Sequence, residues 1–118
     1  MKSLLLMLPL LLLAYNKSYA QTEFELGPSQ SMLMTGKGPG QDGAINPYYG
    51  ENCYSIVKNI GESDFSIRIQ QKGEIIEIIP ISTKEVKRIK LLKGHELYLD
   101  SNAKEKITAT VDFEEIDD

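Results

Sequence analysis

The sequence predicts an all-β protein, an antiparallel β-sandwich of the Ig-like kind with about seven short strands. Apolar and polar residues alternate with the two-residue period of a strand from residue 53 onward. Clusters of turn-forming residues interrupt this alternation about every ten residues. Such short intervals favour antiparallel neighbours, because parallel crossovers need a dozen or more residues. A small β-barrel built from the same strands is the alternative fold.

Residues 1–20 have the three parts of a secretory signal peptide. Lys2 supplies the basic start, residues 4–14 are apolar, and Ser18-Tyr19-Ala20 is a small-x-small cleavage site. As a helix the apolar run would be about 16 Å long, too short for a bilayer core of about 30 Å. We therefore expect cleavage after Ala20, no membrane span in the rest of the chain, and export to the periplasm or the cell exterior.

The exported form would contain 98 residues, with 11 basic and 17 acidic side chains, because Lys2 and Lys17 leave with the signal peptide. Its net charge would be −6, and an acidic chain is a poor candidate for a nucleic-acid binder. Cys53 is the only cysteine, so no disulfide can form within the chain. A small exported domain of this kind depends on its core, and the combination favours a bacterial envelope or secreted protein.

Residues 21–52 form an N-terminal segment of a different character. Glu23 to Leu26 and Ser31 to Met34 can each form a short strand and supply the seventh. Residues 35–50 contain five glycines and two prolines, which excludes a regular helix or strand there. A structureless loop of this length is uncommon in a compact domain and is usually either functional or loose.

Residues 53–113 are expected to hold the core strands. The alternation is clearest in residues 65–70 and 107–113, where apolar side chains share one face. Leu97 and Leu99 alternate with polar neighbours in the same way, whereas residues 54–57 and 86–92 are less regular.

Two stretches depart from the simple alternation. Residues 74–81 (EIIEIIPI) are almost continuously apolar, which predicts a strand buried on both faces. Pro80 should end the pairing of that strand or lie at a sheet edge. Residues 114–118 form an acidic tail, which we expect to be solvated and frayed.

The Gly-rich loop holds the first candidate site. Tyr48 and Tyr49 can offer flat faces and hydroxyls to a carbohydrate or peptide, or can instead cover the core. Asp42 can contribute a carboxylate to the same site, although its spacing from Asn46 does not fit a calcium-binding EF-hand loop. A phosphate-binding P-loop is excluded, because Lys37 is followed by glycine and no helix follows.

A basic run is the second candidate site. It could form a patch for an anionic polymer or a membrane headgroup. The favoured interpretation is an edge strand whose lysines prevent sheets from pairing edge to edge. The five basic residues are Lys84, Lys87, Arg88, Lys90 and Lys93.

Cys53 and His95 are the only residues of their types, and together they could form a thiolate–imidazole pair. They lie 42 positions apart, so only the fold could bring them together. The favoured interpretation is a buried apolar cysteine and a solvated histidine. One cysteine and one histidine are too few for a common zinc or blue-copper site, so no metal or cofactor is expected.

These observations predict a small exported, non-enzymatic binding or accessory module whose partner is a protein or carbohydrate of the cell envelope. The alternative is a structural or assembly subunit that pairs through sheet edges, with Phe24 to Met34 as an exposed segment for self-association. A small hydrolase is the third hypothesis. It is the least favoured, because no pair of carboxylates is placed as an acid–base couple.

Overall fold

The computed structural model describes residues 22–102 and 104–116, so the predicted signal peptide at residues 1–20 lies outside the described part. Eight strands follow one another in this described part of the chain. They are β1 (Thr22–Leu26), β2 (Ser31–Thr35), β3 (Cys53–Asn59), β4 (Phe65–Gln71), β5 (Glu74–Ile81), β6 (Val86–Leu91), β7 (Glu96–Asp100) and β8 (Ile107–Glu115).

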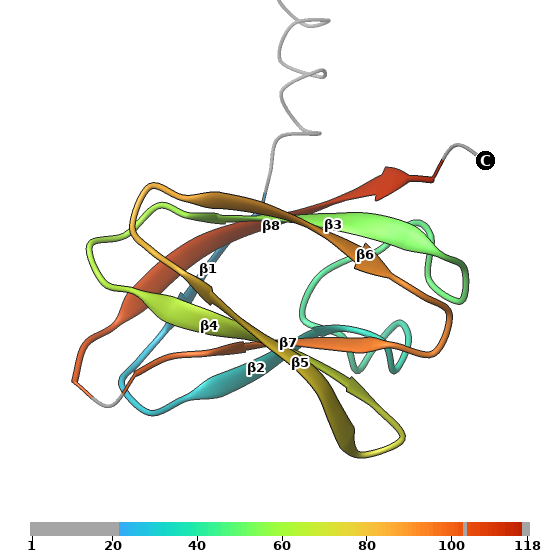
Figure 1. Cartoon of the computed structure of the whole chain (residues 1–118), viewed down its shortest axis with the longest axis horizontal. Coiled ribbons are helices and arrows are strands. Elements are labelled where there is room, and N and C mark those ends of the chain that lie inside the picture. Colours follow the sequence, from blue (N-terminus) through green and yellow to red (C-terminus); the bar gives the residue numbers. More distant parts are fainter. Residues whose placement is uncertain (1–21, 103, 117–118) are drawn as a thin grey trace, which may run out of the picture.

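The strands form two four-stranded antiparallel sheets that pack face to face (Figure 1). The first sheet has the order β1-β8-β3-β6 and the second the order β2-β7-β4-β5. The predicted antiparallel β-sandwich is therefore confirmed, with separate sheets instead of a closed barrel. There are eight strands because both N-terminal stretches form one, each pairing with a strand from the C-terminal half.

The core lies between the two sheets and follows from the two-residue alternation of the strands. Ile67, Leu97 and Leu99 point inward from the second sheet and are fully buried. Val57 and Ile107 meet them from the first sheet and are also fully buried. Each such side chain contributes about 1.5–3 kcal/mol through burial, and the core they form joins the sheets without a disulfide.

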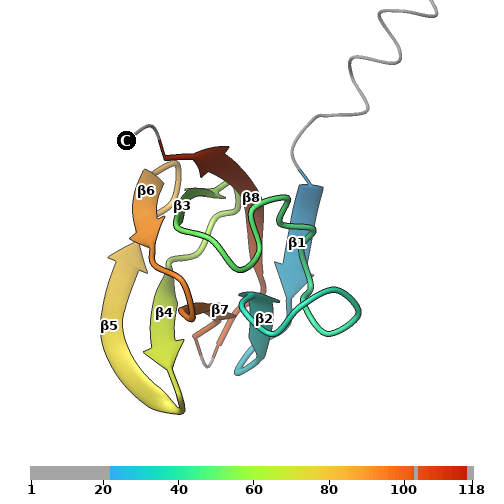
Figure 2. The same ribbon diagram turned by 90° about the vertical axis from the view of Figure 1, so that its right-hand side faces the viewer.

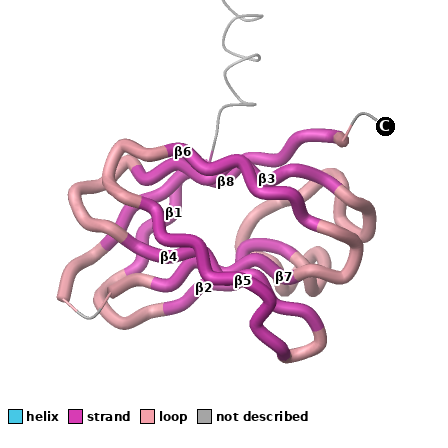
Figure 3. The backbone as a smooth tube through the Cα atoms, in the orientation of Figure 1, coloured by secondary structure: helices cyan, strands magenta, loops and turns pink. Residues whose placement is uncertain are grey.

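The ends of the two strand orders are the sheet edges: β1 and β6 in the first sheet, β2 and β5 in the second. β1 and β2 border one open side of the sandwich, and β5 and β6 border the other. Figure 2 shows β5 and β6 together on the left and β1 and β2 on the right. Figure 3 shows that loops gather at the two ends of the sandwich, where the strands terminate.

The prediction that residues 74–81 are buried on both faces is wrong. They form β5, an edge strand, and Ile75, Ile76 and Ile78 are about half exposed, at 56%, 49% and 57%. A register shift opposite Ile69 and Gln70 places an extra residue on β5, and the β4–β5 hairpin projects beyond the core (Figure 1). The edge position predicted from Pro80 is confirmed.

Two boundaries near the chain ends also differ from the prediction. The acidic tail was expected to begin at Glu114, but β8 continues to Glu115, and Glu114 pairs with Tyr54 of β3. The segment from Phe24 to Met34 is exposed in part: Glu25 and residues 28–31 are exposed, whereas Leu26 and Met34 are buried and Phe24 packs on the core. In both cases strand pairing includes residues that look peripheral in the sequence.

Within the described residues, no helix is long and apolar enough to span a membrane.

Candidate functional site

The loop that joins β2 to β3 is organised by the carboxylate of Asp42. One carboxylate oxygen accepts hydrogen bonds from the backbone N–H groups of Lys37 (2.9 Å) and Gly38 (3.1 Å). The other accepts from the N–H of Gly36 (3.0 Å) and the hydroxyl of Thr35 (3.3 Å). Asp42 was predicted to bind a ligand, and the structure places it as the hydrogen-bonding centre that gives this Gly-rich loop a defined shape.

Gly36 is required where the loop leaves β2. Its φ of 131° lies in a region that side chains rarely adopt. A Cβ atom there would stand 2.7 Å from the backbone Cα of Glu96 and 2.7 Å from the carbonyl oxygen of His95. The loop therefore lies directly against the start of β7.

Asn46 joins the loop to both flanking strands. Its side-chain amide donates to the hydroxyl of Thr35 in β2 (3.1 Å) and to the Sγ atom of Cys53 in β3 (3.7 Å). Its carbonyl oxygen accepts the backbone N–H of Tyr48 (2.8 Å). Asn46 thereby sets the direction in which the following two tyrosines leave the loop.

The two tyrosines have different environments. Tyr48 is half-buried and packs against the core, so it matches the core-covering interpretation. Tyr49 is 45% exposed, and its hydroxyl end lies beside Gly38. Of the predicted pair, Tyr49 is thus the residue with an accessible aromatic face.

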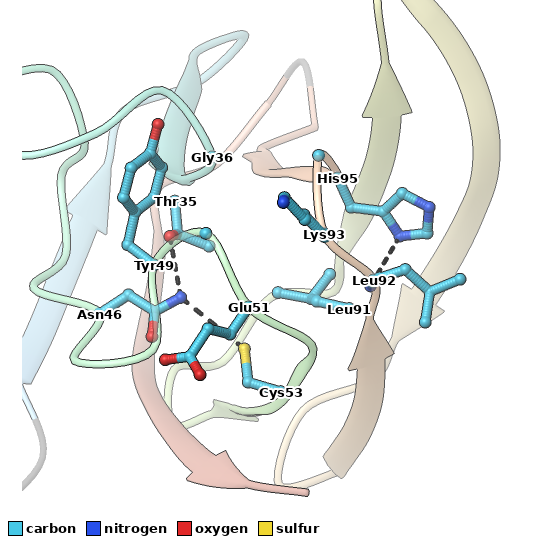
Figure 4. A pocket seen from close by; sticks show the side chains of 12 residues that line it. Thr35, Gly36, Asn46, Tyr49, Glu51, Cys53, Leu91, Leu92, Lys93 and His95 are labelled. Carbon is cyan, nitrogen blue, oxygen red and sulfur yellow. Dashed lines mark hydrogen bonds between the residues drawn. The ribbon is translucent and has the colours of Figure 1, made fainter.

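A cavity of about 200 Å³ opens at this end of the sandwich (Figure 4). Three chain segments converge on it: the end of β2, the second half of the loop, and the β6–β7 turn. Figure 4 shows Tyr49 and Asn46 on one side and Lys93 and His95 on the other. The lining residues are Thr35, Gly36, Asn46, Tyr49, Gly50, Glu51, Cys53, Leu91, Leu92, Lys93, Gly94 and His95.

Cys53 and His95 both border this cavity, but they do not form a reactive pair. Cys53 is 1% exposed, and burial is the main cause that raises the pKa of its thiol. His95 uses its Nδ1 atom to accept the backbone N–H of Leu92 (3.1 Å), and its ring points away from Cys53 (Figure 4). Burial keeps Cys53 a neutral thiol at neutral pH, whereas a nucleophile would have to be a thiolate.

The basic run falls on β6, and β6 is an edge strand of the first sheet, as predicted. Ile89 and Leu91 point into the core, while Arg88 and Lys90 face outward. Arg88 lies 4.0 Å above the ring of Tyr54 and forms a 2.9 Å ion pair with Glu114. Lys87 pairs with Glu85 at 3.3 Å, and the remaining candidates, Lys84 and Lys93, lie in the turns at either end.

The exposed surface of β5 was not predicted from the sequence. Beside Ile78 and Pro80 lies a shallow groove of about 440 Å³, which also reaches Phe65, Asp64 and Asp100. The signals that could have indicated it are Pro80 and the two glutamates, which interrupt an otherwise apolar strand.

A cluster on the outer face of the second sheet was also missed. Arg68 of β4 binds Asp100 of β7 and lies 4.2 Å above the ring of Tyr98. Ser31 of β2 donates to the same carboxylate at 2.6 Å. Because these residues come from three strands, only the strand order reveals the cluster. Among the described residues, no group of three or more His, Cys, Asp or Glu side chains is arranged to hold a metal ion.

Comparison with known proteins identifies a likeness in fold. No protein-family model matches the chain, and no curated protein matches it. A solved structure described as "Crystal structure of PirA" superposes with a TM-score of 0.56 at 12% sequence identity. The match covers 79% of this chain and 92% of that one. At this level of identity the likeness concerns the β-sandwich architecture alone.

Proposed function

We propose that this protein is an exported, non-enzymatic binding module that takes one sugar residue of a cell-envelope carbohydrate at the loop end of the sandwich. The observation that carries the proposal is the cavity of about 200 Å³ with the accessible face of Tyr49 at its rim. The cavity is smaller than the roughly 300–1,000 Å³ of sites for drug-sized ligands, and suits a single sugar ring.

The side chains around the cavity suit a polar ring with one apolar face. Tyr49 offers an aromatic surface for the C–H groups of a sugar and a hydroxyl for hydrogen bonding. Glu51 can accept hydrogen bonds from sugar hydroxyls, and Lys93 can donate to them. The hydrogen bonds of Asp42 and Asn46 hold the loop in place before any ligand arrives, which reduces the entropy lost on binding.

Two features support a non-enzymatic, exported protein. Burial of Cys53 favours the protonated form of its thiol, and one ring nitrogen of His95 already accepts a hydrogen bond from the backbone. Residues 1–20 carry the signal-peptide pattern. The Ig-like description and the envelope location are parts of the same proposal.

The test is an NMR titration of the isotopically labelled protein with a panel of monosaccharides. We expect shifts of the amide signals of residues 49–53 and 93–95, with a dissociation constant in the millimolar range that is common for single small ligands. Tyr49→Ala should abolish the shifts. Tyr54→Ala is the matched control, because Tyr54 stacks on Arg88 away from the cavity. A flat response to every sugar, or equal shifts in Tyr49→Ala, would contradict the proposal.

A second candidate function is an assembly subunit that pairs through sheet edges. The exposed isoleucines of β5 favour it, because three half-exposed isoleucines on one strand form an apolar surface of the kind that marks an interaction site.

A further inference from the structure

We infer that two copies of this chain associate side by side, with β5 of each copy pairing antiparallel to β6 of the other. The inference rests on the second candidate function and names its partner. It does not depend on the cavity at the loop end.

The first observation is a concentration of exposed apolar side chains on one open side of the sandwich. Ile75, Ile76 and Ile78 on β5 are half exposed, and Val86 on β6 is 52% exposed. Both strands are sheet edges and lie on the same side (Figure 2). Four large apolar residues on two adjacent edges mark this side as a surface that another molecule covers.

The second observation is charge complementarity between the two edges. The charged residues of β5 are Glu74 and Glu77, and those of β6 are Lys87, Arg88 and Lys90. Pairing β5 with β5 would bring glutamates together, and pairing β6 with β6 would bring basic residues together. The crossed pairing of β5 with β6 places opposite charges next to one another, and like charges across a strand pair are destabilising.

The third observation concerns direction and closure. A four-residue turn links β5 to β6, and the strands run in opposite directions along the open side (Figure 1). A two-fold axis parallel to the strands would therefore place β5 of each copy antiparallel to β6 of the other, which gives two equivalent strand pairs. Such an interface uses the same surface on both copies and closes after two subunits.

The side chains also match face by face. In the joined sheet, Val86 and Arg88 share the outer face with Ile78, while Lys87 lies on the same face as Glu77. The groove beside Ile78 would receive a basic side chain of the second copy, because the carboxylate of Asp64 lines it.

The opposite open side is less suited to this role. β1 also carries two glutamates, Glu23 and Glu25, but its one large aromatic residue, Phe24, packs on the core. A contact between β1 and β6 would join opposite sides of the sandwich and would propagate as an open chain. Polymer formation is thus the signature of that alternative.

The test is sedimentation velocity of the purified protein over a range of concentrations, with a charge swap between the edges. We expect a monomer–dimer equilibrium that weakens as salt is added. Glu77→Lys and Lys87→Glu should each weaken the dimer about tenfold or more, and the double variant should recover most of the loss. Glu23→Lys on β1 is the matched control and should leave the dimer unchanged.

Each outcome bears on the inference. A monomer at all concentrations would overturn both the assembly function and the pairing. A dimer in which the double variant shows no recovery would overturn the β5–β6 pairing while leaving sheet-edge assembly intact. An open polymer weakened by Glu23→Lys would overturn the closed dimer in favour of β1–β6 contacts. Circular dichroism of each variant confirms that it folds, and Ile78→Lys provides a second variant that should also dissociate the dimer.

Discussion

Arg68 and Asp100 form a two-point ion pair that joins β4 to β7 on the outer face of the second sheet. The Nε atom of Arg68 lies 2.8 Å from one carboxylate oxygen, and a terminal guanidinium nitrogen lies 2.9 Å from the other. Both side chains are mostly shielded from solvent. Parallel hydrogen bonds of this kind between charged groups are stronger than neutral ones and fix geometry.

The Arg68–Asp100 pair predicts a loss of stability in acid. The hydrogen bond from Arg68 lowers the pKa of Asp100 below its ordinary value, and Ser31 adds to the effect. A carboxyl with a lowered folded-state pKa stabilises the fold above the unfolded pKa of about 3.9, and this stabilisation is lost as pH falls through the folded-state pKa. Asp100→Asn should cost about 1–3 kcal/mol at neutral pH and progressively less in strong acid, as measured by urea unfolding.

The control for this prediction is Glu114→Gln, which removes the ion pair with Arg88. Both partners there are more than half exposed, so the change should cost less than about 1 kcal/mol. Equal costs for the two variants at neutral pH would show that the Arg68–Asp100 geometry has no special weight.

Asp42 is predicted to keep the β2–β3 loop ordered. In Asp42→Ala the backbone N–H groups of Gly36, Lys37 and Gly38 lose their acceptor, so their amide hydrogens should exchange faster with solvent. The loss of stability should be about 1–3 kcal/mol. Glu25→Ala, which breaks only an exposed ion pair with Lys106, serves as the comparison. Unchanged exchange at the three amides would contradict the role given to Asp42.

Gly36 and Gly40 allow backbone strain to be separated from a steric clash. Both have positive φ angles, of 131° and 92°, but only a Cβ at Gly36 meets neighbouring backbone. Gly40→Ala should therefore cost only the conformational strain of about 1 kcal/mol. Gly36→Ala should cost clearly more and lower the melting temperature further, because the start of β7 must shift. Equal melting temperatures would mean that the loop can move away from β7 at no cost.

Cys53 is predicted to be unreactive in the folded protein. Its side chain is buried, and its raised pKa leaves little thiolate at neutral pH. A thiol reagent such as Ellman's reagent should react slowly with the native chain and rapidly once denaturant is added. His95→Ala should leave the reaction rate of the folded protein with the reagent unchanged. A lower rate in this variant would instead support a thiolate–imidazole pair.

Much of the fold can be predicted from the local alternation of apolar and polar residues. The alternation in residues 65–70 and 107–113 predicts the inward faces of β4 and β8, because successive side chains of a strand point to opposite faces. Ile89 and Leu91 also point inward on β6, although the alternation in residues 86–92 is less regular. These predictions succeed because a strand needs only its own sequence to assign its two faces.

The position of a strand within its sheet is a different matter. The apolar run of residues 74–81 is compatible with a central strand and with an edge strand. In the structure it pairs with β4 and with no other described strand, which makes it an edge strand. The convergence of Tyr49, Lys93 and His95 on one cavity, and of Arg68, Tyr98 and Asp100 on one sheet face, likewise joins residues far apart in the chain.

The sequence by itself determined the strand class and the inward faces of the most regular strands, since these follow from side-chain periodicity. The tertiary structure decided which edges stay open, which tyrosine is accessible and what surrounds Cys53. Those properties depend on long-range strand pairing, in which a segment's neighbours come from distant parts of the chain.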